Sequence, residues 1–173
     1  MSVVTNATPL IYLAKIGKLL LLKKIYGRVI IPEEVRKEVV DKGKQLGEPD
    51  ALIIEQAIKD GWLIVEKTKK SKLPVDIQAG EAAVLAIAKE KKIKEVIIDE
   101  ISARTAAKIF GLTPKGTISI LLKALAIKEI TLEEFIDFLE KLLQHGFRLK
   151  EEIYLEAIKK AKKLDKEEKE EVE

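Results

Sequence analysis

The stretch SVVTNATPLIYLAKIG, residues 2–17, is the part of the sequence that decides the fold class. Its first four residues are largely β-branched, which predicts a short buried strand. Thr8 and Pro9 predict a helix start, with Thr8 as the N-cap and Pro9 at the first helical position. The helix expected over 9–16 carries Leu10 and Leu13 on one face, and Gly17 ends it.

The same alternation of strand and helix continues through the first two thirds of the chain. We expect further strands at 28–31, 62–66 and 95–99, with a short fifth strand at 112–113. Helices are expected between them, at 18–26, 33–41, 50–59, 77–91 and 101–110. This order predicts an α/β fold with three layers, in which helices cover both faces of a parallel sheet of four or five strands.

The last third of the sequence is helical throughout. Apolar periodicity predicts helices over 117–127 and 151–163, and a capping box at 131–134 begins another helix between them. We interpret residues 1–163 as one domain, with a helical extension at 117–163 that packs on the sheet or forms a dimer surface. The tail at 164–173 is nearly all charged, so we expect it to fray.

Composition excludes several kinds of site. The chain has 173 residues, no Cys and one His, which excludes disulfides and thiolate metal sites and argues against a histidine-based zinc site. The net charge of +3 is small, so any grip on nucleic acid must come from a local patch. Abundant Lys and Glu with few thermolabile residues are typical of hyperthermophile proteins.

Neither a secretion signal nor a membrane span is recognisable in the sequence. The N-terminus lacks a basic segment and a small-residue cleavage site. The longest apolar runs, such as residues 19–22, are far too short to cross a bilayer. We therefore expect a cytoplasmic protein that does not bind a membrane.

Polar residues follow two of the predicted strands. Asn6 and Thr8 come after the first strand, and Asp99 and Glu100 come at the end of the fourth. Ligands of an open parallel sheet bind beyond the carboxyl ends of its strands, so these residues are candidates for a site. The alternative interpretation is a plain turn in each case, with Thr8 and Asp99 as helix N-caps, and it is about as strong.

Two glutamates sit oddly on predicted helices. Glu81 shares a helix face with Val84, Leu85 and Ala88, where a carboxylate is costly unless it is paired or binds a metal. The alternative for Glu81 is a cap role at the helix start. Glu38 borders the apolar face of its helix, and its alternative is an ordinary glutamate paired with a lysine. Oxygen ligands from several segments would suit Mg²⁺ or Mn²⁺, although spacing alone does not show convergence.

Other polar and aromatic features have simpler interpretations. His145 suits the C-terminus of a helix, and Arg104 either holds a phosphate or pairs with a site carboxylate. The basic run KTKKSK at 67–72 is a candidate phosphate-binding patch, with a solvated loop as its alternative. Tyr12 and Trp62 are either base-stacking residues or ordinary core and rim aromatics.

The sequence resembles the PIN (PilT N-terminus) superfamily of metal-dependent ribonucleases. The resemblance rests on four motifs in order, VVTNATPLIYLAKIG, VIIPEEVRKEVV, GEAAVLAIAKEKK and VIIDEISARTAAKIFGL, over roughly residues 2–160. A later Gly-Thr pair, at 116–117, opens a helix as in one prokaryotic branch of PIN-like proteins. The resemblance implies a Mg²⁺ or Mn²⁺ site with ligands at Asn6, Glu38, Glu81 and Asp99.

One position departs from the family pattern, because Asn6 stands where the family has its first acidic residue. An amide oxygen can bind a cation but brings no charge, so metal affinity should fall unless a neighbour such as Asp41 or Asp76 compensates. Asp99 and Glu100 both fit the last acidic position, and Asp99 is preferred because it follows the predicted strand directly. Thr8, Glu100 and Arg104 are expected at the same site.

Two functions from different classes remain open. The first is a Mg²⁺- or Mn²⁺-dependent ribonuclease that acts on single-stranded RNA. Its narrower form is the toxin of a toxin–antitoxin pair, with an antitoxin protein as partner. The second is a PIN-like binding module that has lost catalysis, which Asn6 favours. The apolar helices at 117–127 and from 132 onward, or the first two helices, predict a homodimer.

Overall fold

The computed structural model describes residues 1–69 and 77–172. The chain forms two compact units, Met1–Thr117 and Ile118–Glu173. The first unit contains the sheet and every residue predicted for the carboxylate site, whereas the second contains helices. Each unit is described by itself.

The first unit is built on a five-stranded parallel sheet with the order β3-β2-β1-β4-β5. Residues on neighbouring strands pair in parallel register, for example Val3 with Val29 and Val4 with Val96. The strands are β1 (Ser2–Thr5), β2 (Arg28–Pro32), β3 (Leu63–Glu66), β4 (Glu95–Ile97) and β5 (Thr113–Lys115). The predicted parallel sheet of four or five strands is confirmed, with five.

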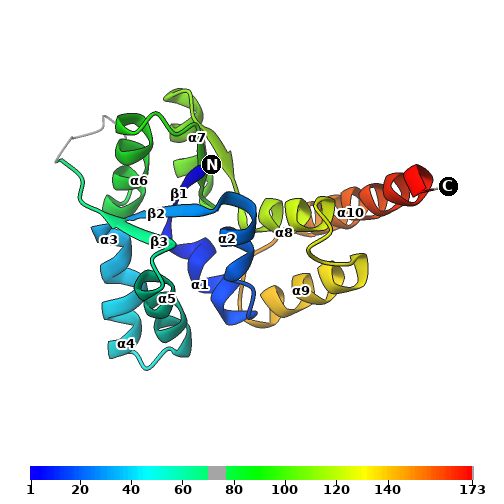
Figure 1. The fold of residues 1–173 in the computed structure, drawn as a ribbon, viewed down its shortest axis with the longest axis horizontal. Coiled ribbons are helices and arrows are strands. Elements are labelled where there is room, and N and C mark those ends of the chain that lie inside the picture. Colours follow the sequence, from blue (N-terminus) through cyan, green and yellow to red (C-terminus); the bar gives the residue numbers. More distant parts are fainter. Residues whose placement is uncertain (70–76, 173) are drawn as a thin grey trace. The chain divides into compact units, whose positions relative to one another are not determined.

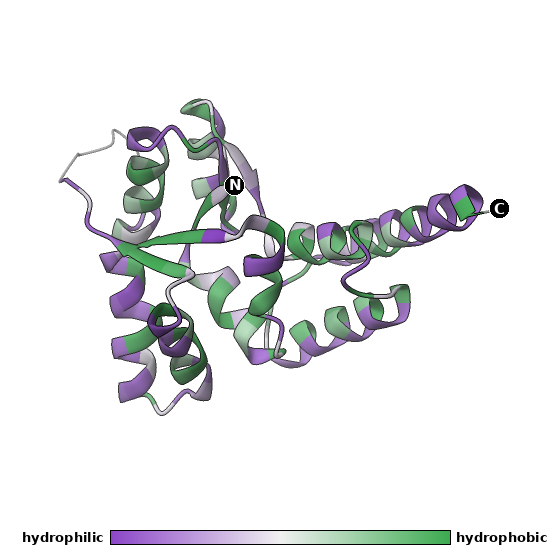
Figure 2. Ribbon diagram, in the orientation of Figure 1, coloured by the Kyte–Doolittle hydropathy of each residue, from purple (hydrophilic) through white to green (hydrophobic). Residues whose placement is uncertain are grey.

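Helices cover both faces of this sheet. They are α1 (Ala7–Lys15), α2 (Leu20–Tyr26), α3 (Glu33–Arg36), the π-helix η1 (Lys37–Lys42), α4 (Gly43–Gln45), α5 (Pro49–Lys59), α6 (Ala79–Glu90) and α7 (Ile101–Ile109). Helices α6 and α7 lie on one face, and α1, α2 and α5 lie on the other (Figure 1). The predicted three-layer α/β/α architecture is therefore confirmed. Apolar residues line the strands and the helix faces turned toward them (Figure 2).

The direction of the chain across the sheet reverses between β1 and β4. From β1 the chain continues to β2 and then β3 on one side, and from β4 it continues to β5 on the other side. The loops that leave the carboxyl ends of β1 and β4 therefore diverge to opposite faces. Such a switch point leaves a crevice where α/β proteins bind their ligands.

The first helix begins earlier than the sequence indicated. The predicted helix over 9–16 in fact starts at Ala7, and Asn6, with an extended backbone, takes the N-cap position that Thr8 was expected to occupy. Pro9 lies inside the first turn. This is tolerated because the first N–H groups of a helix have no partner within it, so a proline there removes no hydrogen bond.

The helix after β2 is longer and less regular than predicted. Residues 33–45 form one continuous helical segment whose middle, Lys37–Lys42, is a π-helix. The wide turn lets Val39 and Val40 both face the interior. Beyond it, Gly43 packs so closely on α5 that a Cβ at Gly43 would lie 2.8 Å from the Cβ of Ala51. Residues 43–45, which lie between the helices predicted at 33–41 and 50–59, are thus helical as well.

The second unit contains α9 (Leu132–Gln144), α10 (Glu151–Val172) and most of α8 (Thr117–Ala126). The predicted cap at Thr131 is present, since its side chain accepts a hydrogen bond from the backbone N–H of Glu134 at 3.1 Å. The tail predicted to fray instead continues α10 to Val172. Ion pairs explain this difference: Lys169 lies 2.9 Å from Asp165, and Lys128 lies 3.1 Å from Glu168.

None of the helices in the described part of the chain combines the length and the apolar character that a membrane crossing requires.

Candidate functional site

The candidate site lies at the carboxyl edge of the sheet, where β1 and β4 end side by side. Asn6 follows β1 directly, and its backbone N–H donates to the carbonyl of Ile97 at the end of β4, at 3.0 Å. Ile98, Asp99 and Glu100 then lead from β4 into α7. The two segments that carry the predicted polar residues are thus joined by a backbone hydrogen bond.

Asn6 turns its side chain into this crevice rather than onto its own helix. It is only 6% exposed, and its side chain makes no capping hydrogen bond to α1. Its Oδ1 would lie 3.7 Å from a Cβ placed on Gly80, in the first turn of α6. The buried amide therefore points toward the start of α6 and, among the described residues, has no side-chain hydrogen-bond partner.

Glu81 occupies the third position of α6 and is only 4% exposed. Its Oε2 accepts the backbone N–H of Gln78 at 3.1 Å, and the Gln78 side chain accepts the N–H of Glu81 in return, which completes a capping box. The cap role weighed from the sequence is therefore real. It uses one carboxylate oxygen and leaves the second for another partner.

Glu38 and Glu100 approach Glu81 from two other elements. Burial raises the pKa of Glu81 above its usual range, the hydrogen bond from Gln78 opposes that rise, and the charges of Glu100 and Glu38 add to it. Glu38 lies on η1, and Glu100 is the N-cap residue of α7 without a capping side-chain bond. Both are exposed. The charges of Glu38 and Glu100 thus reach Glu81 from two other helical elements.

Asp99 is placed differently from these three. The strand that was predicted to run to Asp99 ends at Ile97, so Asp99 does not follow it directly, and the N-cap of α7 is Glu100 instead. Both oxygens of Asp99 accept hydrogen bonds from Thr117, one from its backbone N–H at 2.8 Å and one from its hydroxyl at 2.7 Å. Burial raises the pKa of Asp99, while these bonds and the Arg104 charge oppose the rise.

Arg104 and Gly116 complete the surroundings of Asp99. The guanidinium Nη1 of Arg104 donates to the carbonyl of Ile98 at 3.0 Å. A Cβ added at Gly116 would lie 2.8 Å from Oδ1 of Asp99 and 3.1 Å from Nη1 of Arg104. Only a residue without a side chain lets this segment close over the two groups. Arg104 therefore binds a backbone carbonyl and acts on Asp99 through its charge, and both roles considered for it stay predictions.

Comparison of the sequence with models of known protein families shows to which family the chain belongs. The family model described as PIN domain matches residues 2–163, which is most of the chain. The chain belongs to the PIN domain family. No curated protein matches the sequence. Membership gives the protein a nuclease-type fold and indicates interaction with nucleic acid, and PIN domains generally use divalent metal ions.

The donor atoms of this PIN domain fit a hard divalent cation in kind. The amide of Asn6 and the carboxylates of Glu38, Glu81 and Glu100 supply only oxygen, which Mg²⁺ and Mn²⁺ prefer. The Asn6 side chain is only 6% exposed, and its amide has no side-chain hydrogen-bond partner in the described residues. Every fully buried polar side-chain atom there does have a partner, so the free amide atoms of Asn6 still reach solvent and are open to a ligand. Within residues 1–69 and 77–172, however, no three acidic or histidine side chains are placed to hold one ion together.

The other polar residues singled out from the sequence have ordinary local surroundings. Thr8 is half-buried in the first turn of α1, and Asp41 pairs with Arg36 at 2.9 Å. His145 is the C-cap residue of α9, as its alternative interpretation proposed. Of the basic run, Lys67 and Lys69 are exposed. Residues 70–72 and Asp76 lie outside the described residues.

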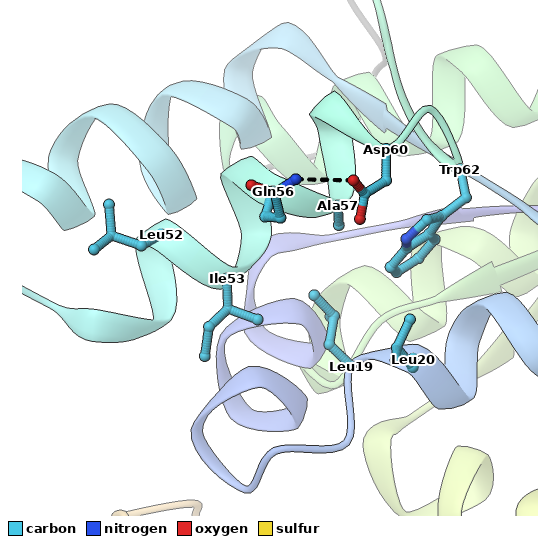
Figure 3. Close-up of a pocket in the computed structure, with 8 residues that line it drawn as sticks. All are labelled: Leu19, Leu20, Leu52, Ile53, Gln56, Ala57, Asp60 and Trp62. Carbon is cyan, nitrogen blue, oxygen red and sulfur yellow. Dashed lines mark hydrogen bonds between the residues drawn. The ribbon is translucent and has the colours of Figure 1, made fainter.

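Trp62 lies at the opposite edge of the sheet, where β3 begins. It is 6% exposed and lines an apolar pocket of about 390 Å³ in the first unit (Figure 3). The pocket is bordered by residues from the start of α2 and from α5, namely Leu19, Leu20, Leu52, Ile53, Gln56, Ala57 and Asp60. Its position rules out base stacking by Trp62 at the carboxylates of this PIN domain.

Sequence reasoning missed the roles of Gln78, Gly116 and Thr117. Gln78 was detectable, because it precedes Glu81 by three residues and so completes a capping-box spacing. The Gly-Thr pair was noticed only as a family feature that opens a helix. Its contact with Asp99 joins residues 18 positions apart, which no local pattern encodes.

Proposed function

We propose that the protein is a divalent-metal-dependent ribonuclease of the PIN type that cleaves single-stranded RNA. The observation that carries the proposal is the Asn6 side chain, which is only 6% exposed, makes no capping hydrogen bond to α1, and has its Oδ1 near Gly80, the residue before the buried Glu81. The pKa of Glu81 is raised first by burial and then by the charges of two further carboxylates, and such a carboxylate is unfavourable without a counter-charge. A bound cation would supply that charge.

Different residues of the chain would have different roles in such a site. Glu81 and Asn6 are buried and held by the first turn of α6 and by β1, so they would fix the position of an ion. Glu38 and Glu100 are exposed and would close around it. The ion would supply positive charge for in-line attack of water on a phosphodiester. Arg104 is held at Ile98 and Asp99, so it would shape the site rather than grip substrate phosphate.

A second candidate is a PIN-fold binding module without catalysis. Two observations favour it: the neutral amide at position 6, and the lack of three acidic side chains placed around one point in the described residues. Fewer charged ligands mean weaker binding of Mg²⁺ or Mn²⁺. The nuclease remains our preferred function because a plain binding module gives no reason for a buried glutamate, Glu81, whose pKa is raised by burial and by the charges of two further glutamates.

The two candidates are separated by Asn6→Asp. If the site is a nuclease, the added charge should tighten Mn²⁺ binding by about tenfold or more and raise cleavage of a single-stranded RNA oligonucleotide. Calorimetric titration with MnCl₂ measures the first effect, and gel analysis of the oligonucleotide measures the second. Glu81→Gln in the Asn6→Asp background should abolish both.

Glu55→Gln is the matched control, because Glu55 is an acidic residue of α5 that pairs with Lys59 at 3.2 Å and lies outside the site. It should leave Mn²⁺ binding and cleavage unchanged. If Asn6→Asp leaves both at background level, the binding-module candidate replaces the nuclease.

The proposed ribonuclease could act as the toxin of a toxin–antitoxin pair, and that role can be tested in cells. A ribonuclease of this type acting as a toxin would arrest growth when expressed alone and would be silenced by a co-expressed antitoxin protein. Growth arrest that Glu81→Gln fails to relieve would separate toxicity from the carboxylate site and contradict the toxin role.

A further inference from the structure

The apolar pocket of Figure 3 lies in the first unit, at the edge of the sheet where β3 begins. It is bordered by the start of α2, by α5 and by Trp62. We infer that this pocket binds a small organic cation, a molecule with an apolar body and one ammonium group. The inference goes beyond the proposed function, because the predicted carboxylate site lies at the opposite edge of the sheet.

The walls of the pocket are apolar. Leu19, Ala57 and Trp62 are buried, whereas Leu20 and Ile53 line the pocket and remain exposed. The volume of about 390 Å³ lies in the lower part of the range of about 300–1,000 Å³ that is typical of pockets for small molecules. Size and walls therefore favour a small ligand with a hydrocarbon body.

The charge among the residues that line the pocket is negative. It belongs to Asp60, whose Oδ1 accepts a hydrogen bond from Nε2 of Gln56 at 2.8 Å, the dashed line of Figure 3. Within residues 1–69 and 77–172 Asp60 forms no ion pair, since the neighbouring Lys59 pairs with Glu55 at 3.2 Å. The carboxylate charge is therefore free to attract a positively charged ligand.

The end of α5 adds to this negative charge. Asp60 is the C-cap residue of this helix of 11 residues, and the carbonyl groups of the last turn form the negative end of the helix dipole. A carboxylate at this position is unfavourable for the helix, whereas a cation is favourable. Asp60 is therefore an acid where helix stability alone would favour a basic or neutral residue.

Trp62 supplies an aromatic surface and a free donor to the same pocket. Its indole N–H has no hydrogen-bond partner among the described residues, and every fully buried polar side-chain atom there has one, so the N–H reaches solvent. An ammonium group held over the ring would gain a cation–π attraction. Trp62 is also the one tryptophan of the sequence, so tryptophan fluorescence reports on this pocket alone.

Fluorescence titration with three matched probes tests the inference. Phenethylamine, phenethyl alcohol and hydrocinnamate share a phenyl group on a short alkyl chain, and at neutral pH they are cationic, neutral and anionic. We expect phenethylamine to change the emission of Trp62 with a Kd of about 1 mM or lower. The neutral alcohol should bind about two- to fivefold more weakly, as the loss of one exposed ion pair implies, and the anion more weakly still.

Asp60→Asn separates the role of charge from that of apolar surface, because it keeps an oxygen acceptor for Gln56. It should weaken phenethylamine by about two- to fivefold and leave phenethyl alcohol unchanged. Glu55→Gln is the matched control, since Glu55 lies on the same helix but does not line the pocket. It should leave the affinities of all three probes unchanged.

Four results would overturn the inference. Phenethyl alcohol that binds as tightly as the amine, or Asp60→Asn without effect on the amine, would show that the pocket recognises apolar surface alone. An unchanged emission with all three probes would show that it holds no small ligand of this kind. An emission that shifts with protein concentration and without a probe would place a second copy of the chain over the pocket instead.

Discussion

Asn6 and Glu81 are both buried, and Asn6 lies near Gly80, the residue before Glu81, so charge is expensive at both positions. Burial and the charges of Glu100 and Glu38 destabilise the ionised form of Glu81, which is why its pKa is raised. An aspartate at position 6 would add a further negative charge beside it. The amide at position 6 therefore favours the stability of the metal-free protein over the affinity of the metal site, a trade found in many active sites.

The raised pKa of Glu81 predicts how stability depends on pH. Between the lower pKa of the unfolded chain and the higher pKa of the folded protein, the folded state binds more protons, so stability falls as the pH rises through that window. Glu81→Gln removes this titration and keeps an oxygen acceptor for the Gln78 N–H. Without metal, the variant should melt at a higher temperature than the natural chain at neutral pH.

Melting curves from about pH 4 to about pH 8 check this prediction, since the advantage of Glu81→Gln should shrink as the pH falls toward the ordinary glutamate pKa. Excess MnCl₂ should raise the melting temperature of the natural chain and not that of the variant. A variant that is less stable at every pH would show that the capping box, rather than charge burial, dominates at this position.

The bounds of some helices and strands can be predicted from the local sequence pattern more accurately than those of others. The strand Ser2–Thr5 was predicted with its true bounds, because β-branched residues at the start of a buried parallel sheet leave little choice. The start of α1 was misplaced by two residues, because proline is accepted anywhere in a first helical turn. Glu81 was found because an acid on an apolar helix face violates the hydrophobic pattern.

Features that depend on contacts between different helices and strands could not be predicted from the local sequence pattern. The preference for Asp99 over Glu100 relied on a strand that ends two residues earlier than expected, and the donors that hold Asp99 come from beyond β5. The π-helix at Lys37–Lys42 depends on how both of its ends pack. Periodicity within one segment carries no information about either.

The close contact of Gly43 with α5 gives a prediction about element packing. Gly43→Ala would place a Cβ 2.8 Å from that of Ala51, so one of the two helical segments must shift. We expect this to lower the free energy of unfolding by about 1–3 kcal/mol, as overpacked cores do, although alanine is the better helix former. Urea denaturation followed by circular dichroism measures it.

Ala51→Gly supplies the control, because it removes the methyl group that Gly43→Ala would meet. The double variant should be more stable than the sum of the two single changes implies. If Gly43→Ala is neutral or stabilising by itself, the contact is softer than the distance indicates.

At the scale of the molecule, the site is confined to the first unit. Asn6, Glu38, Glu81, Glu100 and the Asp99–Thr117 pair all lie within Met1–Thr117. The apolar side chains of α8 and α9 that suggested a dimer, such as Leu121 and Phe135, are buried within the single chain. The expected homodimer therefore stays a prediction that rests on other apolar residues.

Three apolar side chains beside the pocket of Figure 3 remain exposed: Leu20 is 58% exposed, Leu52 is 60% and Ile53 is 45%. If the protein forms a homodimer through this surface, light scattering at high micromolar concentration should give twice the mass of the chain, and Leu52→Glu should return it to one. Thr105→Glu, on the exposed side of α7, is the surface control. A single chain mass for the natural protein would contradict the dimer.

The π-helix has a consequence for how the gene can change. One end of the segment 33–45 is fixed where Val35 lies near Gly80, and the other where Gly43 meets Ala51. A π turn holds one residue more than an α-helical turn, so it reconciles two ends that a regular helix would leave out of phase. Loss of one codon within the π turn would therefore leave a regular helix whose two ends keep their phase. Loss of a codon elsewhere between the two anchors, with the π turn kept, would instead rotate one end by about 100° relative to the other.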